Sequence, residues 1–247
     1  QSPLARVDRL GVTLDGRDLD RIVIPGGPRV IWAIARQHPG ESMAEWWMEG
    51  FIRRMLDPAD ALARHLRSQA TLHIVPNMNP DGSIRGHLRC NASGANLNRE
   101  WHGPTLDRSP EVLHVLNAMD ASGVDLCLDV HGDEALAYTF ISGCEGVPCF
   151  DERLATLSRS FSDAYERANP DFQQVHGYSI DKPGDANMTM CTNAVAERFG
   201  CPGLTLEMPF KDNADAPDPV NGWCPRRSKA MGRSAVDAMV EVVASLR

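Results

Sequence analysis

The sequence predicts an α/β fold, in which helices flank a central β-sheet. Short apolar runs alternate along the chain with amphipathic helical patterns, which is typical of strands connected by helices. The chain has 247 residues, of which 43% are hydrophobic and 23% charged, an ordinary globular composition. No internal repeat, low-complexity tract or linker interrupts it. We therefore expect residues 1–247 to form a single domain.

Short segments rich in Val, Ile, Leu and Thr are expected to form the strands of this sheet, because branched side chains favour extended backbone. Segments of this length are too short for helices of ordinary size. The expected strands are Arg21–Ile24, Val30–Ala35, Thr71–Val75, Leu126–Val130, Tyr138–Ile141 and Leu204–Leu206.

Three helices are predicted by apolar side chains that recur every three or four residues. The first covers Ala44–Leu56 and ends at Asp57-Pro58, because the residue before a proline disfavours the helical conformation. The second covers Leu154–Tyr165 and ends before Pro170, and the third covers Met231–Leu246. We expect their Met-rich and aromatic faces to pack in the core.

The charge and the apolar run lengths exclude two classes of partner. There are 33 acidic and 25 basic residues, so the net charge of −8 argues against binding to duplex nucleic acid. No apolar run approaches the roughly 20 residues of a membrane-spanning helix.

The seven cysteines include no CxxC pair, which favours reduced thiols and a cytoplasmic location.

His38 is the first candidate for a metal-binding residue. It follows the expected strand Val30–Ala35, and open α/β sheets bind ligands at the carboxyl ends of their strands. Glu41 comes three residues later, near a helix start, so its carboxylate can turn to the same side as the imidazole. This pair suits Zn²⁺. A surface histidine beside a helix N-terminal carboxylate would produce the same pattern.

His131 and Glu207 are two further candidates. His131 follows the expected strand Leu126–Val130, so two histidines and Glu41 would form a His₂Glu zinc site with a water in the fourth position. A histidine satisfied by a neighbouring turn is the alternative. Glu207 lies in an apolar strand, where a carboxylate must be paired, linked to a metal or shifted in pKa. Pairing with an arginine is the alternative for Glu207.

A polar segment between the two histidines carries further motifs, and the ordered set resembles the M14 family of zinc carboxypeptidases, most closely its cytosolic carboxypeptidase branch. The resemblance covers about residues 30–210 and implies a mixed central β-sheet flanked by helices, the zinc-carboxypeptidase-like (phosphorylase/hydrolase-like) fold. The matching motifs are His38-Pro-Gly-Glu41, Asn79-Pro-Asp-Gly82, Arg89-Cys90, Asn98-Arg99-Glu-Trp101, His131 and Thr205-Leu-Glu207.

The resemblance implies a zinc metallocarboxypeptidase that binds one Zn²⁺ per chain. His38, Glu41 and His131 match the zinc ligands of the family. Glu207 matches the general base that takes a proton from the zinc-bound water and passes it to the leaving amine. The implied substrate is the C-terminal peptide bond of a peptide or protein, or a side-chain-linked glutamyl bond.

The resemblance also implies a set of substrate contacts. Arg89 matches the arginine that stabilises the oxyanion. Asn98 and Arg99 match the pair that binds the terminal carboxylate, a task that suits the two-pronged guanidinium group. Because only a free C-terminus satisfies such a pair, the implied enzyme is an exopeptidase.

The sequence departs from the family pattern at three positions. Asn96 replaces the aspartate that usually supports the first histidine ligand, and it offers no charge. Many members have a tyrosine about 20 residues before the catalytic Glu; Tyr178 lies farther upstream and matches poorly. Asn187 stands where glutamate-removing members carry arginine, so this pocket does not support deglutamylation.

Other expectations concern the wider protein and the competing functions. With His38 close to the first residue, we expect no room for the β-sandwich domain that usually precedes the catalytic domain in this branch.

An N-acyl amino acid hydrolase of the aspartoacylase or succinylglutamate desuccinylase type is the competing enzyme, and a cell-wall amidase is a further one. A non-catalytic binder of C-terminal tails is the alternative from a different class.

Overall fold

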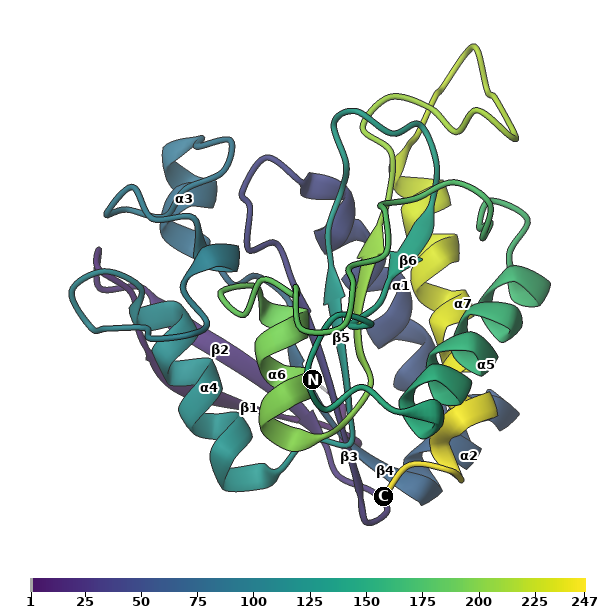
Figure 1. The fold of residues 1–247 in the computed structure, drawn as a ribbon, viewed down its shortest axis with the longest axis horizontal. Helices are drawn as coiled ribbons and strands as arrows, with labels where there is room; N and C mark the ends of the chain where they lie inside the picture. The colour runs from purple at the N-terminus through teal and green to yellow at the C-terminus, as the bar shows by residue number, and fades with distance from the viewer. Residues whose placement is uncertain (1) are drawn as a thin grey trace.

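The computed structural model describes residues 2–247, and within that range the chain forms a seven-stranded sheet of order β1-β2-β4-β3-β5-β7-β6 (Figure 1). The central strands are buried along most of their length, because their apolar side chains pack against helices on both faces of the sheet. The strands are β1 Arg6–Val12, β2 Asp18–Ile24, β3 Arg29–Ala35, β4 Ala70–Val75, β5 Leu126–Val130, β6 Phe140–Ser142 and β7 Gly203–Glu207.

The sheet is mixed, as expected. Strands β4, β3, β5 and β7 run parallel to one another, whereas β2 joins β4, β1 joins β2 and β6 joins β7 in antiparallel pairs. The carboxyl ends of β3, β5 and β7 therefore meet at one edge of the sheet. The candidate site residues His38 and His131 follow β3 and β5, and Glu207 is the last residue of β7.

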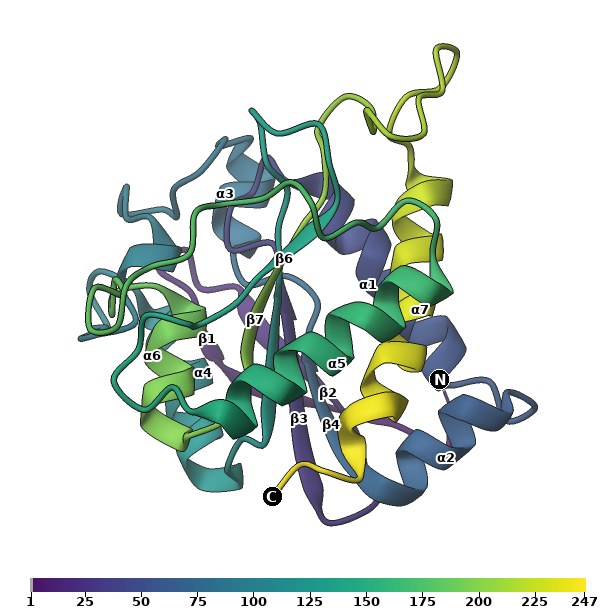
Figure 2. The ribbon, with the colours of Figure 1, turned by 45° about the vertical axis from the view of Figure 1, so that its right-hand side comes forward.

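Helices cover both faces of the sheet, with α1, α2, α5 and α7 on one side and α4 and α6 on the other (Figure 2). The three predicted helices are α1, α5 and α7, and α5 ends before Pro170 as expected. The helices are α1 Ser42–Met55, α2 Ala61–Gln69, α3 Pro80–Arg85, α4 Pro110–Ser122, α5 Glu152–Ala168, α6 Cys191–Phe199 and α7 Pro225–Val243, with a short 3₁₀ turn over Leu97–Arg99.

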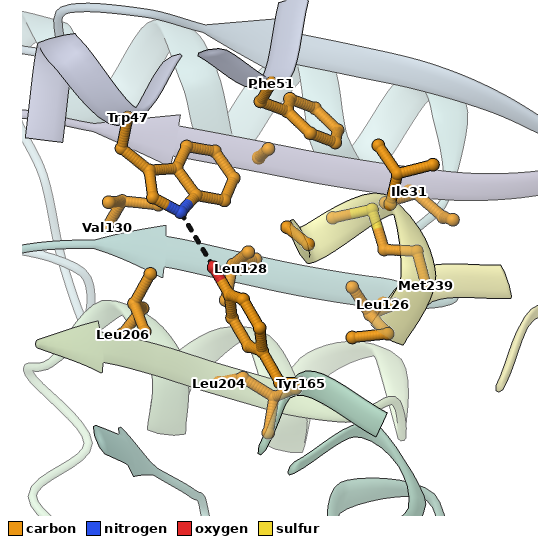
Figure 3. Packing of buried hydrophobic residues seen from close by; sticks show 14 of the residues in the cluster. Ile31, Trp47, Phe51, Leu126, Leu128, Val130, Tyr165, Leu204, Leu206 and Met239 are labelled. Carbon is orange, nitrogen blue, oxygen red and sulfur yellow. Dashed lines mark hydrogen bonds between the residues drawn. The ribbon is translucent and has the colours of Figure 1, made fainter. Parts of the chain in front are cut away.

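The larger core lies between the sheet and helices α1, α5 and α7 (Figure 3). The indole nitrogen of Trp47 donates a 2.9 Å hydrogen bond to the hydroxyl of Tyr165, which in turn donates to the carbonyl of Met231 at 2.8 Å. These bonds satisfy polar atoms inside the core. Glycines bring α1 and α7 together, because a Cβ at Gly232 would lie 2.0 Å from the carbonyl oxygen of Trp47.

Several elements differ from the sequence-based expectation. Strand β1 has no counterpart among the predicted strands, because it lies at the sheet edge and half of it is exposed, so its sequence lacks an apolar pattern. Strand β6 begins at Phe140, two residues after the start of the predicted strand Tyr138–Ile141. Helices α2, α3, α4 and α6 were also not predicted; α3 begins with the Asn79-Pro-Asp-Gly82 turn motif.

All seven cysteines are free thiols. No helix within residues 2–247 is long and apolar enough to cross a membrane. The cytoplasmic location and the single domain stay predictions.

Candidate active site

Two histidines and a glutamate meet at the carboxyl edge of the sheet. His38 follows β3, His131 follows β5, and Glu41 immediately precedes α1. The Nδ1 atom of His38 lies 2.6 Å from Oε1 of Glu41, and Nδ1 of His131 lies 2.8 Å from Oε2. All three side chains are buried, and one ligand atom from each lies within 4.8 Å of the others.

A tight turn between β3 and α1 places His38. Arg36 has a φ of 58°, in the left-handed region that non-glycine residues rarely adopt. Its guanidinium donates a 3.0 Å hydrogen bond to the carbonyl of Pro39 and pairs with Glu45. These contacts close the turn, so that the imidazole of His38 faces Glu41.

The donor set fits a zinc ion. The Nε2 atom of His38 lies 2.9 Å from Oδ1 of Asn96, and Nε2 of His131 lies 2.8 Å from Oδ2 of Asp129. Because both Nε2 atoms face oxygen acceptors, a hydrogen is favoured on each Nε2, and Nδ1 is the nitrogen that would bind a metal at the common centre. Two imidazole nitrogens and a carboxylate form a ligand set typical of catalytic zinc.

The charges around this centre favour a cation. Burial alone would raise the pKa of Glu41, but the positive charge of His131 and hydrogen bonds from both imidazoles lower it to about 2. Burial alone would lower the pKa of His131, but Asp129 and Glu41 raise it well above the ordinary value. The negative charges of Glu41 and Asp129 therefore favour a positive charge at this centre, which a metal ion would supply.

Glu207 lies at the end of β7 and lines the same cavity, which has a volume of about 470 Å³. Burial raises its pKa to about 8, and the charges of Glu41 and Asp133 add to this shift. Its Oε2 atom is buried and accepts no hydrogen bond from the described residues. A carboxyl group with a raised pKa and a free oxygen can take up and release a proton near neutral pH.

Tyr178 is a site residue that the sequence reasoning rejected. Its hydroxyl donates to Asp133 and lies 3.2 Å from Oε1 of Glu207. The ring packs edge-on against Phe140, with ring centroids 5.0 Å apart, and a Cβ at Gly177 would lie 3.1 Å from that same ring. The spacing between Tyr178 and Glu207 along the sequence did not predict this contact, because it reflects only the length of the intervening segment.

Arg89, Asn98 and Arg99 line the cavity at the side facing the two histidines. Arg89 is partly exposed, with Nη1 4.0 Å from Oε1 of Glu41. Asn98 is buried and accepts a 2.8 Å hydrogen bond from the backbone nitrogen of Cys191. Arg99 donates to the carbonyl of Asn98 at 2.6 Å and forms no ion pair within residues 2–247. Burial and the nearby Arg89 lower the pKa of Arg99. This side of the cavity can therefore bind an anionic group.

The Asn79-Pro-Asp-Gly82 turn motif and Asn187 lie outside the cavity. The side chain of Asn79 caps α3 by accepting from Gly82, and Asp81 binds the β1–β2 connection through Thr13. The turn motif therefore has a structural role. Asn187 accepts hydrogen bonds from Thr189 in the turn before α6 and does not line the cavity.

Comparison with known proteins agrees with this geometry. The family model for zinc carboxypeptidases of the M14 family matches residues 1–229. The chain belongs to this family. The expected family and fold are thereby confirmed.

Two solved metallo-carboxypeptidases superpose closely on the chain. A metallo-carboxypeptidase from Burkholderia cenocepacia has a TM-score of 0.96 and 45% identity, covering 100% of this chain and 67% of its own. A metallo-carboxypeptidase from Pseudomonas aeruginosa, solved with (2-guanidinoethylmercapto)succinic acid, has a TM-score of 0.95 and 43% identity, covering 98% and 65%.

Curated relatives are longer than this chain. An uncharacterised protein of Zymomonas mobilis is 52% identical over 239 residues, which cover 97% of this chain and 63% of that protein. Human cytosolic carboxypeptidase 4 is 39% identical over 116 residues, which cover 44% of this chain and 10% of that protein. The chain described here thus spans less than two thirds of the length of each of these two curated relatives.

Proposed function

We propose that this chain is a zinc-dependent metallocarboxypeptidase that hydrolyses the C-terminal peptide bond of peptides or proteins. The observation that carries the proposal is the arrangement of His38, Glu41 and His131, whose ligand atoms face one centre in the cavity that Glu207 also lines. Membership of the zinc carboxypeptidase family supports it. One Zn²⁺ per chain is the implied cofactor.

His38, Glu41 and His131 would hold the zinc ion. When bound, zinc polarises the scissile carbonyl and lowers the pKa of a water to roughly 7. Glu207 accepts the proton of the attacking water on its carboxylate and delivers it to the leaving amine. Its buried position, which favours the protonated form, suits the second of these transfers.

Arg89 and Arg99 would bind the charged parts of the substrate. Arg89 stands beside Glu41 and can donate to the oxyanion that forms at the scissile carbon, where loss of one donor typically costs about 10²–10³ in rate. Asn98 and the unpaired Arg99 bind the terminal carboxylate, which restricts cleavage to a free C-terminus. The ligand of the Pseudomonas relative is itself a succinic acid, which carries two carboxylates.

The cavity also contains Ser142, Met190 and Thr205, which are uncharged. The same cavity also contains the carboxylates of Asp133 and Glu134, whereas its two arginines are the residues assigned to the oxyanion and the terminal carboxylate. We therefore propose neutral or basic C-terminal residues as the preferred substrates, rather than the glutamyl side chains of deglutamylases.

Mass spectrometry of a peptide library with mixed C-termini tests this function. Zinc-loaded wild type should remove single C-terminal residues, whereas Glu207→Gln should remove none and amidated peptides should stay intact. Glu241→Gln, an exposed change on α7, serves as the matched control and should behave as wild type. Cleavage of N-acyl amino acids without cleavage of peptides would instead support the acyl hydrolase. Binding of peptide tails without any cleavage would support the hypothesis that the chain is a non-catalytic binder of C-terminal tails.

A further inference from the structure

The two histidines of the site are supported by groups of different charge. Nε2 of His38 faces the neutral amide oxygen of Asn96 at 2.9 Å. Nε2 of His131 faces the carboxylate of Asp129, with 2.8 Å between Nε2 and Oδ2. The carboxylate that is missing beside the first histidine is therefore present beside the second.

Asp129 is fully buried in β5, so its carboxylate needs compensating contacts. Gln37 supplies one, because its side-chain nitrogen donates to the same Oδ2 atom at 2.6 Å. The side-chain oxygen of Gln37 accepts a 2.9 Å hydrogen bond from the indole nitrogen of Trp101. Gln37 and Trp101 are buried as well, so these contacts exclude water.

This chain of contacts determines which nitrogen of His131 carries a hydrogen. An indole nitrogen can only donate, so the oxygen of Gln37 must face Trp101 and its NH₂ group must face Asp129. Oδ2 of Asp129 then keeps its negative charge 2.8 Å from Nε2 of His131, and this ion-pair contact favours a hydrogen on Nε2. Nδ1, 2.8 Å from Oε2 of Glu41, is then the nitrogen that would give its lone pair to a bound metal.

We propose that Asp129, held by Gln37 and Trp101, is a positioning residue that keeps His131 in its zinc-binding tautomer and supplies the charge that Asn96 lacks. The proposal rests on the zinc site of the proposed function. Outer groups of this kind typically change metal affinity by about 10- to 100-fold. It also gives a role to Gln37 and Trp101, which the catalytic proposal leaves without one.

Zinc affinity, measured by competition with a fluorescent chelator on metal-free protein, tests the proposal without any hydrolysis assay. Asp129→Asn should raise the zinc dissociation constant about tenfold or more. The asparagine oxygen can replace Oδ2, and Oδ1 accepts no hydrogen bond from residues 2–247, so the fold should persist. Asp125→Asn is the matched control. Asp125 lies just before the same strand, at the end away from the zinc site, where it accepts a hydrogen bond from the backbone nitrogen of Val30. This substitution should leave the zinc affinity unchanged.

Moving the charge provides the second arm. Asn96→Asp should tighten zinc binding by placing a carboxylate beside His38, and the double variant Asn96→Asp with Asp129→Asn should return the dissociation constant to within about threefold of wild type. Trp101→Phe, which frees Gln37 to turn, should weaken binding by several-fold. If Asp129→Asn does not fold, these two single variants decide the question.

Each result has a distinct meaning. Equal zinc affinity of folded Asp129→Asn and wild type would overturn the role of Asp129, as would an Asn96→Asp variant that binds zinc no better. Absence of 1:1 zinc binding by wild type would instead overturn the proposed function. A tight wild-type complex with the predicted order of variants would support both.

Discussion

The hydroxyl of Tyr178 lies 3.2 Å from Oε1 of Glu207 and also donates to Asp133. A donor on the 173–181 segment therefore touches one oxygen of the carboxyl group that we assign as the general base. The other oxygen, Oε2, is buried and accepts no hydrogen bond from the described residues. Because burial together with Glu207 and Asp133 raises the pKa of Tyr178, its hydroxyl stays protonated and remains a donor at neutral pH.

Tyr178→Phe should lower kcat/KM for peptide substrates by about tenfold, equivalent to ~1.4 kcal/mol of transition-state stabilisation. The phenyl ring can keep its packing on Phe140 while the contact of the hydroxyl with Glu207 is lost. Steady-state kinetics with zinc-loaded protein measure the effect. Tyr138→Phe is the matched control, because Tyr138 stacks on His176 and does not line the catalytic cavity. Equal rates for wild type and Tyr178→Phe would refute a role in catalysis.

Glu207 should make metal-free protein less stable as the pH rises. Its pKa is about 8 in the folded chain because of burial, against an ordinary value of 4.5. Below pH 4.5 the group is protonated in both states and has no effect. Between 4.5 and 8 the unfolded chain loses its proton more readily, so stability falls, and above 8 the full cost of the buried charge is present.

Thermal unfolding of metal-free Glu207→Gln against wild type, from pH 5 to pH 9, checks this effect. The variant should unfold at a similar temperature near the acidic end and at a higher temperature near the alkaline end. Each unit of pKa difference corresponds to about 1.4 kcal/mol. A constant difference between the two proteins across this range would contradict the raised pKa.

The sequence predicted the parts of the site that follow buried strands. Val30–Ala35, Leu126–Val130 and Leu204–Leu206 are apolar because both faces of the sheet are covered, and parallel strands bring their carboxyl ends to one edge. The sequence alone therefore places His38 and His131 near each other. Their assignment as ligands required the motif resemblance, since a histidine after a strand is common.

Other parts of the site leave little trace in the sequence. Tyr178 reaches Glu207 from a segment without regular structure, where separation along the chain carries no information about distance in space. Asp129 is a polar residue in a buried strand, so its carboxylate must have a polar contact, but the sequence does not show which residue supplies that contact. The contact of Gln37 with both Asp129 and Trp101 depends on three separate segments meeting.

Asn91 should be needed for the loop that carries Arg89 and Asn96. Its fully buried side chain accepts from the backbone nitrogens of Ser93 and Ala95, each at 3.0 Å, and donates to Glu111 at 3.1 Å. Asn91→Ala should cost about 3 kcal/mol of unfolding free energy, because several buried groups lose partners together. It should also lower kcat/KM, since Arg89 and Asn96 lie on either side of this turn.

Urea unfolding and steady-state kinetics measure these two effects of Asn91→Ala. Asn117→Ala, an exposed change on α4, is the control and should stay within about 0.5 kcal/mol of wild type. A folded Asn91→Ala variant with full activity would show that the turn does not position Arg89.

Asp81→Asn should destabilise the fold while leaving catalysis intact. Asp81 is fully buried and accepts from the hydroxyl of Thr13 at 2.7 Å, the backbone nitrogen of Asp15 at 2.9 Å and the guanidinium of Arg17 at 2.8 Å. These bonds join α3 to the β1–β2 connection, and a neutral amide would satisfy fewer of them. We expect a loss of about 3 kcal/mol in urea unfolding, against almost none for the exposed Asp20→Asn. Because Asp81 does not line the catalytic cavity, kcat/KM of the folded variant should equal that of wild type. A large fall in kcat/KM without a loss of stability would instead show that the turn motif takes part in the reaction.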